Sequence, residues 1–329
     1  MKAAVYSEYG PPEVLSIAEV DKPTPGEKDV LIKVHATSVT ASDYNMRSLN
    51  FPARLNIFYV PSRLVFGWFR PKRQILGMEF AGEIVSAGKS VTRFKVGDQV
   101  YGLAALRVGA YAEYMLMADD AAIALKPENL SYDQAAAIPF GATDANYYLK
   151  ELGNIQPGYK VLIHGASGNV GSMAVQFAKY YGAEVTGVCS GVNFELVKSL
   201  GADHVIDYTA EDFTKNGVKY DLIFDTIGAI WFSEIKRSLA DNGIYLANLM
   251  SGTDILRILW TSIVGGKRIK GGVGPSKPEN MEFFKKLCEE GALKPVIDRR
   301  YTLDQIVEAH RYADTKRKKG SVVITVAQP

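Results

Sequence analysis

The residue pattern with the clearest chemistry lies at residues 165–171, which read Gly-Ala-Ser-Gly-Asn-Val-Gly. An apolar run, Val161 to His164, precedes it, and a stretch with helical character follows. Side chains this small let backbone N–H groups approach a ligand, and a helix N-terminus adds partial positive charge. The spacing matches the G-x-G-x-x-G dinucleotide fingerprint, with alanine in the first glycine position. The segment is therefore expected to bind a pyrophosphate, and a tight turn without a ligand is the alternative.

The residues of this cofactor turn are Gly165, Ala166, Ser167, Gly168, Asn169, Val170 and Gly171. In the fingerprint register Ala166, Gly168 and Gly171 occupy the three fixed positions, and the N–H groups from Gly168 to Gly171 point at the ligand.

The end of the next expected strand bears on which dinucleotide is bound. NAD sites usually place Asp or Glu there, about 20 residues past the glycines, whereas this chain has Cys189, Ser190 and Gly191 and no acid before Glu195. Ser190, Asn193 and Tyr208 can donate hydrogen bonds to a 2′-phosphate. The pattern favours NADP(H), although no Arg or Lys lies in this segment. For Tyr208 a surface-facing strand end without a ligand is an equal alternative.

The elements that must position this turn fall into two kinds. Before residue 120, short alternating runs with glycine turns, such as 29–39 and 80–88, predict a barrel-like all-β unit. From about residue 130, strands alternate with helices of about ten residues, which indicates a doubly wound parallel sheet. We expect an α/β domain over 123–265 to be inserted into a β-rich domain formed by 1–122 and 266–329.

Composition excludes several classes of function. The net charge of +2 favours no nucleic acid partner, and the cluster Lys316–Lys319 is expected to be a solvated turn. Two cysteines cannot form a disulfide framework. No run approaches the roughly 20 apolar residues of a membrane span, and the first residues lack a signal peptide's apolar core, so a cytoplasmic location is expected.

Several motifs, taken in order, resemble the medium-chain dehydrogenase/reductase superfamily, in its zinc-independent quinone oxidoreductase branch. They include ILGMEFAGEIVSAGKSVTRFKVGDQVYG, PENLSYDQAAAIPF, VLIHGASGNVGSMAVQFAKYYGA and SLGADHVIDY. The resemblance implies a Rossmann domain inserted into a GroES-like substrate domain, with a cleft between them. It also implies an NADPH-dependent oxidoreductase that forms a homodimer through the α/β domain, where the segments 243–249 and 267–274 could supply the edge.

The zinc ligands of metal-dependent members are missing. Their Gly-His-Glu position reads Gly77, Met78, Glu79, and no cysteine precedes Cys189. A catalytic zinc needs three N, S or O ligands, so zinc is excluded on the donor set. The expected substrates are small lipophilic electrophiles that accept hydride without a Lewis acid, namely quinones and alkenes conjugated to a carbonyl.

On the substrate side, the family's Asn-Pro-x-Asp turn corresponds to Thr40–Asp43. Tyr44 is the candidate for binding the substrate oxygen or relaying a proton, and Asn45 for holding a carbonyl or carboxamide. The alternative is that Asp43 and Arg47 form only a structural pair. The resemblance also places Thr143 beside the nicotinamide and Leu249, after Ala247 and Asn248, beneath it.

The four histidines form no triad and no metal spacing. His35 is expected to be an ordinary strand residue, His164 to contact the cofactor through its backbone only, and His204 and His310 to be peripheral.

The apolar, basic segment 51–75 has three interpretations: a lid over the substrate, a membrane or partner surface, or an insertion packed on the barrel. For the whole chain a second hypothesis stays open, a non-enzymatic NADPH-binding sensor or chaperone-like protein of the same fold.

Overall fold

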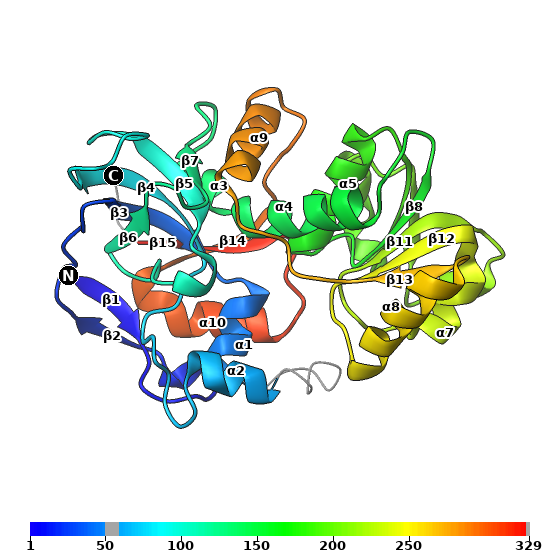
Figure 1. Ribbon diagram of the computed structural model, residues 1–329, viewed down its shortest axis with the longest axis horizontal. Coiled ribbons are helices and arrows are strands. Elements are labelled where there is room, and N and C mark those ends of the chain that lie inside the picture. Colours follow the sequence, from blue (N-terminus) through cyan, green and yellow to red (C-terminus); the bar gives the residue numbers. More distant parts are fainter. Residues whose placement is uncertain (50–58, 327–329) are drawn as a thin grey trace.

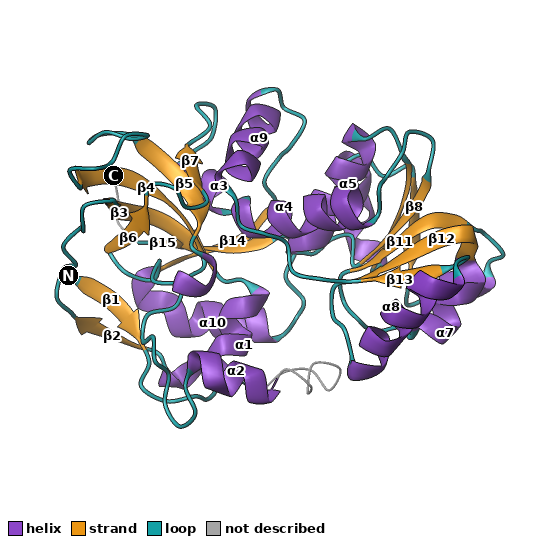
Figure 2. Ribbon diagram, in the orientation of Figure 1, coloured by secondary structure: helices purple, strands orange, loops and turns teal. Residues whose placement is uncertain are grey.

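The computed structural model describes residues 1–49 and 59–326. The described chain has two lobes, a β-rich lobe near both termini and an α/β lobe (Figure 1). Figure 2 separates the strands that form each sheet from the helices that pack on them. The strands are β1 (Lys2–Val5), β2 (Ser16–Glu19), β3 (Asp29–Ser38), β4 (Glu79–Ala87), β5 (Gln99–Leu103), β6 (Tyr114–Ala118), β7 (Ile123–Leu125), β8 (Lys160–His164), β9 (Glu184–Cys189), β10 (His204–Asp207), β11 (Tyr220–Asp225), β12 (Leu239–Ala247), β13 (Arg268–Lys270), β14 (Ile297–Thr302) and β15 (Ser321–Thr325). The helices are α1 (Ala41–Ser48), α2 (Tyr59–Phe66), α3 (Tyr132–Ala136), α4 (Pro139–Asn146), α5 (Asn169–Tyr180), α6 (Phe194–Ser199), α7 (Phe232–Ile235), α8 (Gly252–Val264), α9 (Pro278–Glu289) and α10 (Ile306–Asp314).

The α/β lobe is built on a six-stranded parallel sheet in the order β10-β9-β8-β11-β12-β13. Its central strand β8 is apolar throughout its middle because helices cover both faces, and Val161, Leu162 and Ile163 are fully buried. The strand order reverses direction at β8, where β9 and β10 lie to one side and β11 to β13 to the other. Ligands bind outside the carboxyl ends of the strands at such a switch point. The predicted doubly wound fold is confirmed.

The β-rich lobe is a seven-stranded sheet in the order β14-β15-β3-β4-β5-β7, with β6 also paired to β3. The late strand β15 pairs antiparallel with the early strand β3, Ile324 opposite Thr37, which returns the chain to its first domain. The predicted insertion of one domain into the other follows from this pairing.

Both domain boundaries differ from the expected ones, because each boundary strand pairs in the other sheet. Residues 123–125 form β7, which pairs with β5 in the β-rich sheet, and residues 268–270 form β13, which pairs with β12 in the parallel sheet. Of the two segments expected to supply a subunit edge, only β13 is an edge strand, since β12 lies between β11 and β13.

Three helices, α1, α8 and α2, were not expected. The predicted turn at 40–43 is the start of α1, where Thr40 and Asp43 form a capping box that stabilises the first helical turn. Helix α8 begins with the same device, made by Ser251 and Asp254. In the segment 51–75, residues 51–58 lie outside the described residues, and helix α2 follows them with no buried side chain.

Within the described ranges no helix is long and apolar enough to cross a membrane.

Candidate functional site

Most of the predicted cofactor residues lie at the carboxyl ends of five parallel strands. Gly165 follows β8, Ser190 follows β9, Tyr208 follows β10, and Leu249 lies two residues after β12. Gly228, after β11, packs so closely on Leu249 that a Cβ at Gly228 would stand 2.7 Å from the leucine Cβ. Residues distant in sequence therefore meet at one edge of the sheet.

Gly165 makes the tight turn after β8, a role that the fingerprint register assigned to position 166. Its φ of +83° suits glycine, and a Cβ there would stand 2.5 Å from the Thr226 hydroxyl. Ala166 is fully buried, and its N–H donates to Val188 O. Glycine is also required at 171, where a Cβ would stand 2.0 Å from Gly165 O.

Gly168 differs from these two glycines because the space beside it is open. A Cβ there would meet only Gly165 O, at 3.4 Å. Gly168 is the N-cap of α5, without a side-chain cap, and the first helical hydrogen bond runs from Ser172 N to Gly168 O. The N–H groups of Asn169, Val170 and Gly171 thus have no partner within the helix. This arrangement suits an anion.

Unpaired buried oxygens test whether these residues fit a dinucleotide. Thr143 Oγ1, Asn169 Oδ1 and Asn193 Oδ1 are buried and have no hydrogen-bond partner among the described residues. Such atoms cost free energy unless a ligand or water pairs with them. All three belong to residues predicted to bind the cofactor, so the residues present fit NAD(P)H.

Asn193 organises the corner expected to hold the adenosine ribose. Its side-chain amide donates to Ser167 Oγ (3.2 Å) and Ser190 Oγ (3.0 Å), which ties the glycine turn to the end of β9. Tyr208 is 59% exposed, and its N–H donates to Cys189 O. Ser167, Ser190 and Asn193, all predicted to bind the cofactor, therefore contact one another at this corner.

A carboxylate that sequence reasoning missed adjoins this corner. Asp207, at the end of β10, lies opposite Cys189 and accepts a hydrogen bond from Gly191 N at 3.0 Å. Its other oxygen accepts from the Thr209 hydroxyl and N–H, and these bonds lower the pKa of Asp207. An acid was expected only at the end of the second strand, β9, whereas Asp207 ends the third strand, β10.

The segment before β15 joins the cofactor turn to the β-rich lobe. Gly320 N donates to Ser167 O at 2.8 Å, and Gly320 forms an isolated parallel bridge with Gly168. Two residues earlier, Lys318 Nζ donates to Val39 O at 3.2 Å, directly before α1. This chain of contacts places the start of α1 near the cofactor turn.

The prediction of a solvated turn at Lys316–Lys319 is wrong for Lys318. Burial lowers the pKa of its ammonium group, and attraction to Glu79 and Asp43 offsets part of that shift. Lys318 is half-buried rather than fully solvated, and its charge is attracted by two buried carboxyl groups.

Glu79 occupies the position of the family's Gly-His-Glu motif and is fully buried. It accepts hydrogen bonds from the Ser38 hydroxyl and from Phe140 N, the latter at 2.7 Å, and burial raises the pKa of its carboxyl to about 7. In the described part of the chain no three His, Cys, Asp or Glu side chains come together to hold a metal ion.

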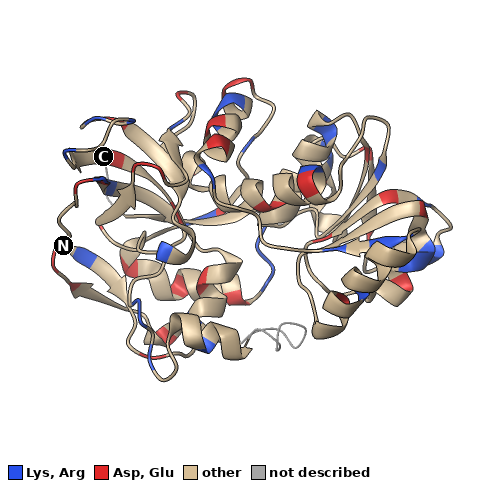
Figure 3. Ribbon diagram, in the orientation of Figure 1, with Lys and Arg blue, Asp and Glu red and all other residues tan. Residues whose placement is uncertain are grey.

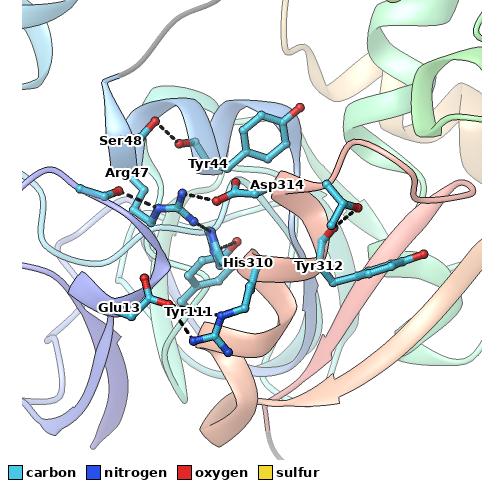
Figure 4. Close-up of polar contacts among 11 residues, drawn as sticks. Glu13, Tyr44, Arg47, Ser48, Tyr111, His310, Tyr312 and Asp314 are labelled. Carbon is cyan, nitrogen blue, oxygen red and sulfur yellow. Dashed lines mark hydrogen bonds and ion pairs between the residues drawn. The ribbon is translucent and has the colours of Figure 1, made fainter.

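Helix α1 carries the two candidate catalytic residues, both half-buried. Burial first, and Asp314 second, raise the pKa of the Tyr44 phenol, which keeps it protonated at neutral pH. In Figure 4 the Tyr44 ring points away from the polar cluster around Arg47. Asn45 accepts a backbone hydrogen bond from Leu49 N at its carbonyl.

Asp43 and Arg47 are structural, but they do not pair with each other. Asp43 caps α1 and also accepts from Gly77 N at 3.0 Å. Arg47 donates to Asp314 (2.7 Å) and contacts His310 Nδ1 (3.0 Å), and His310 in turn contacts the Tyr111 hydroxyl (Figure 4). The Arg47 cluster fastens α1 to α10.

One histidine prediction is wrong. His310 is fully buried in the Arg47 cluster rather than peripheral, and burial together with Arg47 lowers its pKa. His164 Nδ1 lies 2.9 Å from Asp225 Oδ1, so its side chain is engaged within the protein, and its backbone contact with the cofactor stays a prediction. His35 stacks on Tyr132, and His204 is exposed beside Glu184.

Asp144, next to Thr143 in α4, gives a stability prediction. Burial raises the pKa of Asp144 from 3.8 to about 7. The folded-state pKa is higher than the unfolded-state value of 3.8. The contribution of the protonated carboxyl to the free energy of unfolding is therefore fully present below pH 3.8, and it is lost as the pH rises towards 7. We expect Asp144→Asn to raise the free energy of unfolding at pH 8 by about 2 kcal/mol, with little change at pH 4. Urea unfolding of both proteins at the two pH values measures this, and equal effects at both would contradict it.

Comparison with known proteins agrees with this architecture. Residues 26–128 match the family model described as alcohol dehydrogenase GroES-like domain, and residues 200–324 match the one described as zinc-binding dehydrogenase. The chain is 32% identical to 2-methylene-furan-3-one reductase of Solanum lycopersicum, over 98% of this chain and 79% of that protein. It is 30% identical to the chloroplastic NADPH-dependent alkenal/one oxidoreductase of Arabidopsis thaliana, with the same coverage.

Among solved structures, the quinone oxidoreductase from Coxiella burnetii superposes with a TM-score of 0.85 at 29% identity and covers 99% of both chains. The resemblance inferred from the motifs is confirmed. This chain is an oxidoreductase that belongs to the medium-chain dehydrogenase/reductase superfamily, in its NAD(P)H-dependent quinone oxidoreductase branch.

Proposed function

We propose that this protein is an NADPH-dependent reductase of quinones or α,β-unsaturated carbonyl compounds and that it works without zinc. The observation that carries the proposal is the open glycine turn at the start of α5, together with the unpaired buried oxygens of Thr143, Asn169 and Asn193. The reactions named for the tomato and Arabidopsis relatives, and for the Coxiella structure, support the substrate class.

The preference for NADPH over NADH rests on the ribose corner. The Ser190 hydroxyl accepts from the Asn193 amide and keeps its own proton free to donate, and Tyr208 adds an exposed phenol at the next strand end. The one nearby carboxylate, Asp207, is engaged by Gly191 N and by Thr209. Hydrogen bonds to a charged phosphate contribute about 1.5–3 kcal/mol each, so two of them would outweigh the repulsion from an engaged carboxylate.

The absence of zinc chemistry rests on the donor set at the motif position. Met78 offers only a thioether, and both oxygens of Glu79 already accept hydrogen bonds. Quinones and conjugated alkenes accept hydride without a metal, and the bound dinucleotide supplies that hydride. The chain's own contribution is to orient the reactants and to exclude water.

Tyr44 and Asn45 would hold the substrate oxygen. The raised pKa of the Tyr44 phenol keeps the group neutral, so it can act as a hydrogen-bond donor, and its ring points away from the Arg47 cluster. A protonated phenol can donate a hydrogen bond as negative charge develops on a carbonyl oxygen.

The experiment is to follow NADPH absorbance with the purified protein and a panel of quinones and alkenals. Saturable oxidation of NADPH by at least one class, unchanged by a zinc chelator, is expected. Saturable NADPH binding without any oxidation would instead favour the non-enzymatic hypothesis, and activity that requires stoichiometric zinc would contradict the metal-free proposal.

We also propose a homodimer that forms through the open edge strand β13. Helix α8, which packs on β13, exposes the apolar stripe Leu256, Leu259, Trp260, Ile263 and Val264, each 61% to 83% accessible. These residues recur at helical spacing on one face, continuous with the unpaired sheet edge, so a second copy can cover both.

Ile263→Glu tests this dimer, because a buried unpaired carboxylate opposes association. We expect a dimer for the unmodified protein and a rise in its dissociation constant of about 100-fold for the variant, measured by light scattering after size exclusion. Val96→Glu, at a side chain that is 61% exposed in the β-rich lobe, is the control. A monomeric parent protein, or a variant that stays dimeric, would rule the interface out.

A further inference from the structure

A second exposed apolar surface lies on the β-rich lobe. It consists of Val60, Leu64 and Val65 on α2, Trp68 and Phe69 in the loop after it, and Leu106 in the turn Ala105–Arg107. These side chains are 49% to 86% accessible, and Phe69 is the most exposed. We call this surface the α2 patch.

Defined hydrogen bonds fix the shape of the α2 patch. Gly67 N donates to Arg63 O, and Lys72 N donates to Phe66 O at 2.7 Å, which folds the loop back on the helix. Tyr9 also fixes it by donating to Gly67 O at 3.0 Å, and Arg73 ties it to Arg107 O at 2.8 Å. The aromatic side chains at its tip are therefore held outward by defined contacts, although water is an unfavourable environment for them.

The segment that carries the α2 patch has charge of one sign. From Tyr59 to Met78 the sequence contains Arg63, Arg70, Lys72 and Arg73 and no Asp or Glu, and Arg107 adjoins them. Basic residues can be followed along α2 and the loop after it in Figure 3. Two copies of this surface would bring like charges together, which disfavours self-association.

We propose that the α2 patch docks the protein on an anionic lipid surface. Exposed Trp and Phe beside aliphatic side chains insert at the level of the headgroups, and the surrounding Arg and Lys attract anionic lipids. An acidic protein surface would match the charge, but it would not require so many outward apolar side chains. The docking does not depend on the proposed function. If that function holds, lipophilic acceptors dissolved in the bilayer lie next to the protein.

Vesicle flotation tests the proposal with the purified full chain. We expect flotation with vesicles of mixed phosphatidylcholine and phosphatidylglycerol, little with phosphatidylcholine alone, and a loss of about tenfold at high salt. Phe69→Asp should abolish flotation, and Arg70→Glu should weaken it. Both side chains are exposed, so circular dichroism should be unchanged. Val96→Asp, an exposed apolar side chain outside the patch, is the matched control.

Several results would overturn the docking. They are flotation of Phe69→Asp equal to that of the parent protein, equal flotation with neutral vesicles, and no flotation at all. Absent flotation together with self-association that Phe69→Asp removes would assign the patch to a second copy of the chain.

Discussion

Gly168→Asp is expected to lower the affinity for NADPH by about 100-fold or more, because it places a carboxylate where a pyrophosphate would bind at the start of α5. The backbone tolerates the change, since Gly168 has φ −77° and ψ 177°, which any residue adopts. A Cβ there meets only Gly165 O, at 3.4 Å. Fluorescence titration with NADPH measures the loss, and thermal unfolding without cofactor should be unchanged.

Two neighbouring variants separate charge from shape. Gly168→Ala adds the methyl group alone and should keep most of the affinity. Gly171→Ala should instead destabilise the fold itself, since its Cβ would stand 2.0 Å from the backbone of Gly165. If Gly168→Asp folded normally and bound NADPH like the parent protein, the pyrophosphate would not lie on this turn.

Asn193→Asp is expected to reverse the preference between the two dinucleotides. The substitution keeps the shape of the side chain but places a carboxylate between Ser167 and Ser190, where the 2′-phosphate is proposed to lie. Repulsion should weaken NADPH binding by about 100-fold, while NADH, which has ribose hydroxyls there, should bind as well or better. Competition titrations with both dinucleotides measure the ratio.

Asn193→Ala is the control for this second variant. It removes the amide without adding charge, so both dinucleotides should lose affinity by a similar small factor. If the ratio of the affinities for NADPH and NADH were unchanged in Asn193→Asp, the adenosine ribose would not lie beside Ser190 and Asn193.

Much of the fold could be predicted from the sequence because its signals are local and periodic. The apolar run at β8 and the glycine turn after it specify a buried strand followed by a helix, and alternation with helices specifies a parallel sheet. The domain boundaries were less accurate, since membership of β7 and β13 depends on which distant strand each one pairs with. Helix α1 was taken for a turn, although the capping residues Thr40 and Asp43 were a signal that could have found it.

The surroundings of the candidate site depended on contacts that no local pattern encodes. Asp207 reaches the ribose corner only through the pairing of β10 with β9. Lys318 lies in a basic run that is typical of a solvated turn, and only the packing of the last strand against β3 brings it to Glu79. His310 is buried by α1 and α10 together, and α1 was not predicted as a helix.

Isothermal titration calorimetry of the unmodified protein with NADPH and NADH tests the central claim most directly. The account predicts one NADPH site per chain and weaker binding of NADH. It also predicts that Gly168→Asp abolishes the heat of NADPH binding. A protein that is folded and yet takes up neither dinucleotide would contradict it.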